Sequence, residues 1–191
     1  MDLHTAIKQN QIDALRLAFA EGTNADSEDL QSKYTPLMTA VSNPDTTLET
    51  MQFLIDHGAD VNGIGGHSQF QQNVLFLAVP NGSVDKIRLL LDAGADINYS
   101  GPGNSDVIMD AMHGRDIAVD SQLTPLVKLL LELGAPVDGL SEYCESGLSV
   151  SSNNGCFDVV RLLDAGADAE QLSWTELMYL WTLLAIHETV Q

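Results

Sequence analysis

The side chains that could do acid–base or nucleophilic chemistry are scattered along this 191-residue chain, not gathered at catalytic spacings. The two cysteines, Cys144 and Cys156, are not in a CxxC arrangement and have no histidine beside them. We therefore assign neither of them as a nucleophile. The histidines fall far apart, at no spacing typical of metal ligands. They are His4, His57, His67, His113 and His187.

Motifs that carry known chemistry are also missing. The sequence contains no HExxH, GxxxxGK[ST] or GxSxG motif and no EF-hand loop. The stretch Gly63-Ile64-Gly65-Gly66 is rich in glycine, but it does not match GxGxxG and no basic residue follows to hold a phosphate. The sequence therefore predicts a protein that is not an enzyme and holds no cofactor or metal.

The charge of the chain is strongly acidic. Asp and Glu total 27 against 8 Lys and Arg, which gives a formal net charge of −19. Such a chain repels phosphate backbones and anionic lipid, so direct binding to nucleic acid or membrane is not expected. A basic protein would be attracted over a Debye length of about 8–10 Å at physiological salt. The plain alternative is that the charge serves solubility alone.

The expected location is the cytoplasm. The first residues, Met1 to His4, form no basic and then apolar leader. The longest apolar stretch, residues 177–186, is about half of what a membrane span needs. Two cysteines without a disulfide-like pattern fit a reducing compartment.

One phrase recurs along the chain. It reads Gly-Ala-Asp with small variations, follows an apolar run such as Leu89-Leu90-Leu91, and is followed by Asn or Asp. Its glycines stand where a helix C-terminus favours a left-handed residue. They are Gly22, Gly58, Gly94, Gly134 and Gly166, at intervals of 36, 36, 40 and 32 residues.

A second phrase precedes each of these. Thr35-Pro36-Leu37-Met38 opens one helix, with Thr35 as the cap and Pro36 at the first helical position. Looser copies lie at residues 73–78, 106–111, 147–151 and 175–180. Thr124-Pro125 is expected to start a second helix capped by Thr124, with residues 115–123 as an insertion. Thr46 and Glu49 are expected to cap another second helix.

Together the two phrases resemble the ankyrin repeat, whose pattern is TPLHxAA, then a helix ending in LL, then GAD and N. The resemblance implies an all-α solenoid of about five helix pairs in one domain, with repeats at 1–32, 33–70, 71–104, 105–144 and 145–171. Residues 172–191 are expected to form a C-terminal capping helix. The alternative is that Trp174 and Trp181 form a partner or dimer surface.

The resemblance further implies that partners dock on a concave face made of the first helices and the fingers between repeats. Asp60, Asn62, Asp96 and Asn98 belong to the repeat phrase, so they are expected to form turns. Aromatic and acidic residues outside the phrase suit a basic partner. The candidates for contact are Phe70, Tyr99, Asp106, Asp110, His113, Glu142, Tyr143 and Glu145.

Two functional classes remain open. Small acidic stand-alone ankyrin proteins resemble bacterial immunity proteins or antitoxins, so this chain could be a stoichiometric inhibitor of a basic partner such as a nuclease. The charge and the small size favour the inhibitor. The alternative is a general scaffold or regulatory adaptor without an inhibitory role, and an enzyme accessory subunit is a weaker third hypothesis. In each case another protein is the partner, and a monomer is favoured over a dimer.

Overall fold

The computed structural model describes residues 2–67, 71–81, 83–112, 123–137, 139 and 147. The chain divides into two compact units, Met1–Pro102 and Gly103–Gln191. The first unit holds almost all of the first three predicted repeats. The fifth repeat and the capping helix, with Trp174 and Trp181, lie outside the described residues apart from Gly147.

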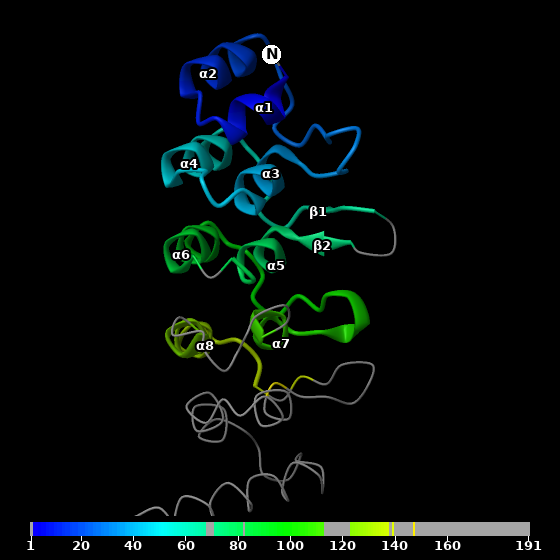
Figure 1. Ribbon diagram of the computed structural model, residues 1–191, viewed down its shortest axis with the longest axis vertical. Helices are drawn as coiled ribbons and strands as arrows, with labels where there is room; N and C mark the ends of the chain where they lie inside the picture. The colour runs from blue at the N-terminus through cyan, green and yellow to red at the C-terminus, as the bar shows by residue number, and fades with distance from the viewer. Residues whose placement is uncertain are drawn as a thin grey trace, which may run out of the picture. The chain divides into compact units, whose positions relative to one another are not determined.

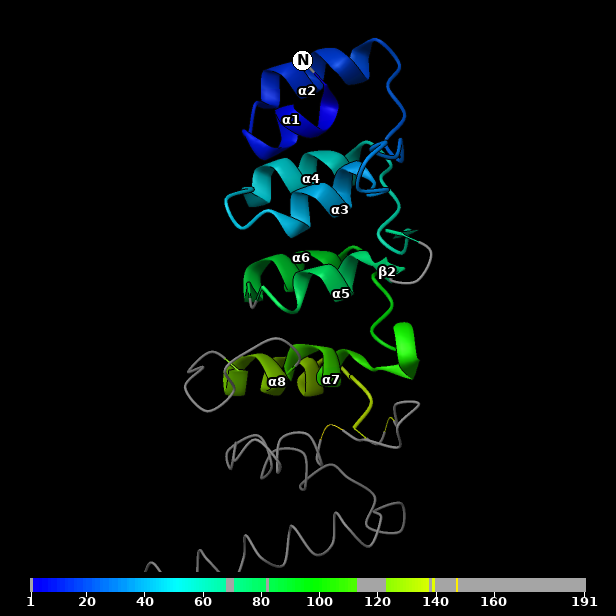
Figure 2. The same cartoon turned by 45° about the vertical axis from the view of Figure 1, so that its right-hand side comes forward.

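The first unit contains three pairs of antiparallel helices stacked in two rows (Figure 1). The first helices of the pairs, α1, α3 and α5, contact one another in sequence, and each packs on the second helix of its own pair. Figure 2 shows the same pairs from the side. The helices are α1 Leu3–Lys8, α2 Ile12–Ala20, α3 Pro36–Ser42, α4 Leu48–Asp56, α5 Val74–Ala78 and α6 Val84–Asp92.

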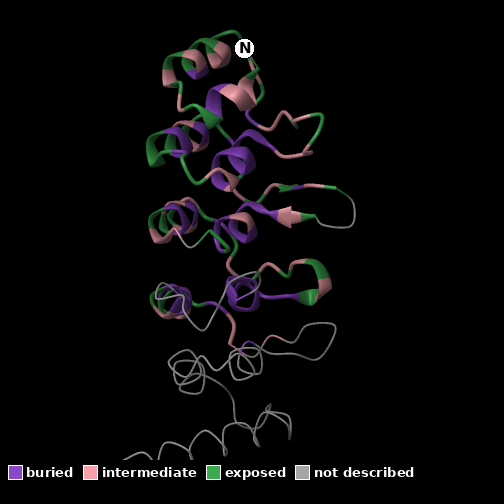
Figure 3. Cartoon of the chain, in the orientation of Figure 1, coloured by how far each residue is buried: buried purple, intermediate pink, exposed green. Residues whose placement is uncertain are grey.

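Apolar residues of the helices form the core, and Figure 3 shows where buried residues lie along each helix. Each fully buried leucine or isoleucine contributes about 1.5–3 kcal/mol relative to an exposed one. No short helix pair could bury such a face alone, so each pair depends on its neighbour. The fully buried members include Ile7, Leu15, Leu37, Met38, Met51, Leu54, Leu75, Ile87 and Leu90.

Side-chain caps start the first helix of each pair, as the second phrase predicted. Thr35 Oγ1 accepts from the Met38 N–H at 3.3 Å, and Asn73 Oδ1 accepts from the Phe76 N–H at 2.9 Å. Such caps contribute about 0.5–2 kcal/mol each. These short helices therefore begin where local chemistry satisfies their free N–H groups.

The cap of α4 differs from the prediction. Thr47 is the capping residue, and its Oγ1 accepts from the Thr50 N–H at 3.3 Å. Thr46, the expected cap, is buried and its Oγ1 has no hydrogen-bond partner. The prediction was wrong by one residue: Thr46 has Glu49 at the position that a capping box requires, but the hydroxyl of Thr47 is the one that reaches the free N–H.

The recurring glycines end the second helices, as predicted. Gly22, Gly58, Gly94 and Gly134 have φ values of 90°, 89°, 94° and 91°. Side chains are strained in that region and glycine is not, so the chain can leave each helix and turn toward the next repeat.

The described part of the second unit holds a fourth helix pair, α7 Val107–Met112 and α8 Leu123–Glu132, whose helices pack on each other. Thr124 was expected to cap α8, but the helix begins at Leu123, so Thr124 lies inside the first turn. The role of Thr124-Pro125 as the start of a second helix is confirmed. Residues 113–122, which hold most of the predicted insertion, lie outside the described residues.

The described fold is mostly helical, with one short hairpin that the all-α prediction did not include. Strands β1 Ile64–Gly65 and β2 Gln72–Asn73 pair antiparallel, with Ile64 opposite Asn73 and Gly65 opposite Gln72. The hairpin forms the finger between α4 and α5. The glycine-rich stretch Gly63-Ile64-Gly65-Gly66 therefore contains a strand, over Ile64–Gly65.

Candidate functional site

In the first unit, hydrogen bonds join the turns that follow the second helices of successive repeats. Asp26 Oδ1 accepts from the Asp60 N–H at 2.9 Å, and Asn62 Oδ1 accepts from the Asp96 N–H at 2.8 Å. Asn62 Nδ2 also donates to the Gly94 carbonyl at 3.0 Å. Each of these hydrogen bonds joins one repeat to the next. These residues are therefore turn-formers, as expected, and they fix the spacing at which successive fingers are presented.

The opposite ends of the helix pairs are joined by a second set of contacts. Asn10 Nδ2 donates to the Asp45 carbonyl at 2.8 Å, and its Oδ1 accepts from the Thr47 N–H at 2.9 Å. Lys86 Nζ donates to the Asn43 carbonyl at 2.8 Å. Since both ends are tied, the three pairs of the first unit form a rigid support for the fingers.

The first finger, between α2 and α3, is ordered by hydrogen bonds around Asp29. The backbone N–H of Ser32 and its Oγ both donate to Asp29 Oδ2 at 2.7 Å, and these bonds lower the pKa of the Asp29 carboxyl below its usual range. The Asp29 N–H donates to the Tyr34 carbonyl at 2.9 Å. Leu30 stands at the turn and is 86% exposed. A leucine held out by an ordered turn loses little further entropy on binding.

The second finger packs directly on the first. The Gly66 N–H donates to the Lys33 carbonyl at 3.0 Å. A side chain on Gly65 would meet Met38 Sδ at 2.6 Å and the Lys33 carbonyl oxygen at 2.7 Å, so only glycine allows this approach. Ile64, next to it on β1, is 50% exposed. The first two fingers are thus in contact with each other, and each carries an exposed apolar side chain, Leu30 on the first and Ile64 on the second.

The third finger carries Tyr99, one of the predicted contact residues. Its ring packs edge-on against Phe76, with centroids 5.4 Å apart and an interplanar angle of 84°. Gly101 passes so close to the Phe76 ring that any side chain there would collide with it. Tyr99 is half-buried. The buried Phe76 therefore positions Tyr99 with part of its surface free.

The positions of Asp106 and Asp110 depart from the expectation of exposed contact residues. Asp106 is 5% and Asp110 is 8% exposed. Asp106 caps α7, since its Oδ1 accepts from the Met109 N–H at 2.7 Å. The aspartate takes the place of Thr35 and Asn73 in earlier repeats, which explains its burial.

The other predicted contact residues lie outside the described part of the chain. Their roles in binding therefore stay predictions. These residues are Phe70, His113, Glu142, Tyr143 and Glu145.

Leu30 and Ile64 are surface residues that the sequence reasoning missed. Nothing in the sequence pattern distinguishes Leu30 or Ile64 from the apolar residues that are expected in the core. A leucine or isoleucine in an apolar pattern is expected in the core, and only the positions of the fingers show that these two are exposed.

An aromatic cluster joins the second helices α2 and α4. The His57 ring stacks on Phe53 with centroids 4.0 Å apart, and Phe19 packs edge-on against Phe53 at 5.5 Å. His57 Nδ1 lies 2.7 Å from the Phe53 carbonyl oxygen, which it can contact only as a donor. His57 therefore closes the C-terminus of α4, as its place beside Gly58 suggested. It is not part of a catalytic group among the residues described.

The described residues contain no group of three or more His, Cys, Asp or Glu side chains that could hold a metal ion. None of the described helices has the length and apolar content needed to cross a bilayer. What the geometry offers is an ordered set of fingers on stacked helix pairs, which is an arrangement for contacting another macromolecule.

These features define a protein built from repeated helix pairs with projecting fingers. A family model described as ankyrin repeats in three copies matches residues 3–100, slightly more than half of the chain. The chain therefore belongs to the ankyrin-repeat family. A comparison with curated proteins found no significant match. Ankyrin repeats are typically protein-interaction modules without catalytic activity, which suggests that this chain binds another protein.

Proposed function

We propose that this protein is a stoichiometric inhibitor of the immunity or antitoxin type, which binds one basic protein through its fingers and first helices. The observation that carries the proposal is a net charge of −19 on a protein-binding fold. A strongly acidic binder attracts basic surfaces and excludes nucleic acid, so it could cover a basic active site such as that of a nuclease.

The distribution of cations among the described residues supports this proposal. Lys86 is buried and bonded to backbone carbonyls, and Lys128 lies 3.9 Å from Glu132 on α8. Fewer cations are therefore left to oppose the acids. A partner rich in Lys and Arg would meet a surface of predominantly negative charge.

The same proposal covers the finer features of the chain. The repeat array is proposed to continue to about five helix pairs as one solenoid, with a capping helix at 172–191. The protein is proposed to be monomeric, because two copies of a chain with net charge −19 would repel each other. It is also proposed to be cytoplasmic.

The ionic-strength dependence of association tests the inhibitor proposal. The tagged full chain would be used to isolate a partner at moderate salt, and association would then be followed by stopped-flow fluorescence. We expect one basic partner, nanomolar or tighter affinity, and an on-rate that falls at least about tenfold between low and high salt. An adaptor without inhibitory role would instead show several weak partners or a rate indifferent to salt. That result would contradict the proposal.

A pair of leucine variants tests the finger surface. Leu30→Ala removes the exposed apolar side chain of the first finger, whereas Leu17→Ala removes one that is 63% exposed on α2, away from the fingers. For the partner isolated above, we expect Leu30→Ala to weaken binding by about thirtyfold, the range of an interface hot spot. Leu17→Ala should leave the Kd within about twofold. Equal effects of the two variants, measured by titration calorimetry, would remove the first finger from the interface.

A further inference from the structure

Two buried carboxyl groups at the start of α7 each have one oxygen without a hydrogen-bond partner among the described residues. Asp106 and Asp110 stand four residues apart, one helical turn, and both side chains are more than nine-tenths buried. The Oδ2 atom of each is buried without a hydrogen-bond partner. Gly139 lies against Asp106 so closely that a side chain there would collide with Asp106 Oδ2. Two ionised carboxylates in such a place would be very costly unless something neutralised them.

The charged groups described around the pair do not supply a cation. Helix α8, which packs on α7, carries Lys128 and Glu132. Lys128 Nζ lies 3.9 Å from Glu132 Oε1, and the two side chains are 64% and 58% exposed. Apart from the pair itself, these are the charged residues in the described part of the unit. A Lys or Arg of a binding partner could not reach oxygens that are already buried.

A proton is the cation that needs no additional room. Protonation removes the charge of one carboxyl and turns it into a hydrogen-bond donor. We propose that Asp106 and Asp110 form a proton-binding pair that keeps α7 packed while at least one of them is neutral, and that loosens the α7–α8 repeat when both lose their protons. This proposal concerns the second unit and does not depend on the identity of a partner.

The titration of the pair sets the pH window. Burial raises the pKa of Asp106 to about 6. Burial and, to a smaller extent, the charge of Asp106 together raise the pKa of Asp110 to about 7. The ordinary pKa of each in an unfolded chain is 3.8. The folded state therefore binds more protons than the unfolded state between about pH 4 and 7, so the second unit loses stability as pH rises through that range.

Hydrogen exchange of the full chain tests this proposal. Amide exchange would be measured by mass spectrometry from pH 5.5 to 8.5 and corrected for the intrinsic pH dependence of exchange. We expect the protection of Val107–Met112 and Leu123–Glu132 to fall by up to about tenfold per pH unit through the titration of the pair. Protection of α3 and α4 in the first unit should not show this slope. Equal protection of α7 at pH 5.5 and 8.5 would overturn the proposal.

Three variants distinguish the titration of the buried pair from the titration of exposed carboxylates in the same unit. Asp110→Asn keeps the size of the side chain and removes one charge, so it should flatten the pH slope of α7. Glu132→Gln removes an exposed carboxylate from the same unit and should leave the slope unchanged. Asp106→Asn should also flatten it and still cap α7, because Asn73 caps α5 in the same way. If either aspartate variant folded and kept the wild-type slope, the pair would not be the proton-binding site.

Discussion

Replacing Phe76 with alanine is expected to lower the free energy of unfolding of the first unit by about 3–5 kcal/mol, as for large buried aromatic residues in general. Phe76 is 1% exposed and is among the largest fully buried side chains described. Its ring supports Tyr99 at a centroid distance of 5.4 Å, and the backbone at Gly101 lies on it. The variant would leave a cavity at the base of the third finger, and adjacent backbone can fill such a cavity only partly.

Urea denaturation followed by circular dichroism measures this loss, with Phe76→Leu as the matched control. Leucine retains much of the apolar volume, so its cost should be less than half that of alanine. Hydrogen exchange in Phe76→Ala should increase most in α5 and in the segment around Tyr99. A loss below about 1 kcal/mol would show that the ring does not support the finger.

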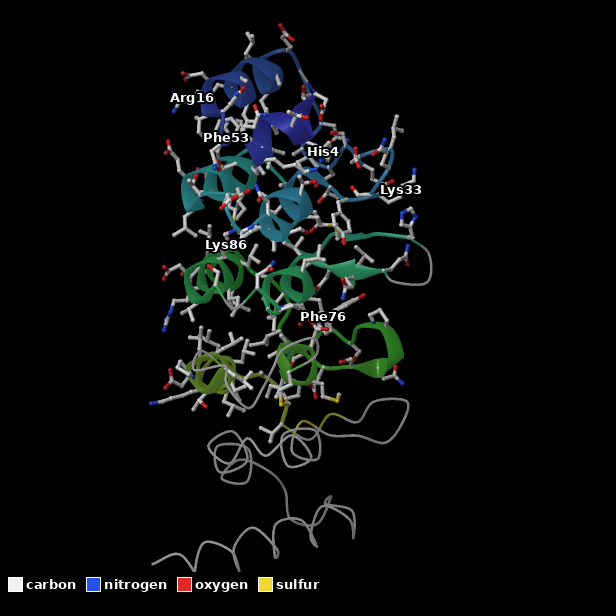
Figure 4. All side chains as sticks on the ribbon, in the orientation of Figure 1. His4, Arg16, Lys33, Phe53, Phe76 and Lys86 are labelled. Atoms are coloured by element: carbon white, nitrogen blue, oxygen red, sulfur yellow. The ribbon has the colours of Figure 1, made fainter. Side chains whose placement is uncertain are left out.

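Replacing Lys86 with alanine is expected to cost about 2–4 kcal/mol, which is unusual for a lysine. Lys86 is 5% exposed, and its Nζ donates to the carbonyls of Asn43 and Pro44 at 2.8 and 3.4 Å (Figure 4). Both carbonyls follow the end of α3, in the preceding repeat. Alanine would remove the packing of the aliphatic stem and the donor to both carbonyls.

Lys86→Met separates the packing of the aliphatic stem from the hydrogen bonds of Nζ, and Lys128→Ala is the control at an exposed lysine. Lys86→Met keeps most of the packing and removes the donor, so it should cost less than Lys86→Ala. Lys128→Ala, at a lysine side chain that is 64% exposed, should change stability by less than about 0.5 kcal/mol. Urea melts at constant pH and ionic strength would measure all three. Equal effects of Lys86→Ala and Lys128→Ala would mean that Lys86 does not join the repeats.

The pKa of Lys86 gives this residue a pH dependence opposite to that of the aspartate pair. Burial lowers the pKa of Lys86 below its ordinary value of 10.5. The folded state therefore binds fewer protons than the unfolded state at alkaline pH, so the first unit gains stability from this group as pH rises toward 10.5. The aspartate pair instead loses its contribution as pH rises through about 4 to 7, so the two units should respond in opposite directions to a rise in pH.

Local features of the fold could be predicted because they depend on residues close together in sequence. Gly22, Gly58, Gly94 and Gly134 end helices with positive φ values, as their places in the repeat phrase predicted. Thr35 caps α3 for the same reason. At the start of α4 the sequence pattern favoured Thr46, which has Glu49 three residues later, but Thr47 is the cap. The side chain of Thr47 reaches the free N–H, and that of Thr46 does not.

The candidate site was less predictable because exposure is not a local property. Tyr99 was identified as a candidate because it stands outside the repeat phrase, and it lies on a finger. Its partner-binding role stays a prediction. Leu30 was missed because only the turn around Asp29 determines that it points out of the core.

By itself the sequence determined the repeat period, the helix ends and the net charge, since each follows from residue type and spacing along the chain. Only the tertiary structure decided that Lys86 is buried against a loop about forty residues earlier, and that Asp106 and Asp110 are removed from water. The cost of burying a charge depends on everything packed around it, including elements far away in sequence. For that reason residues that are expected on the surface from their type alone became buried groups of the core.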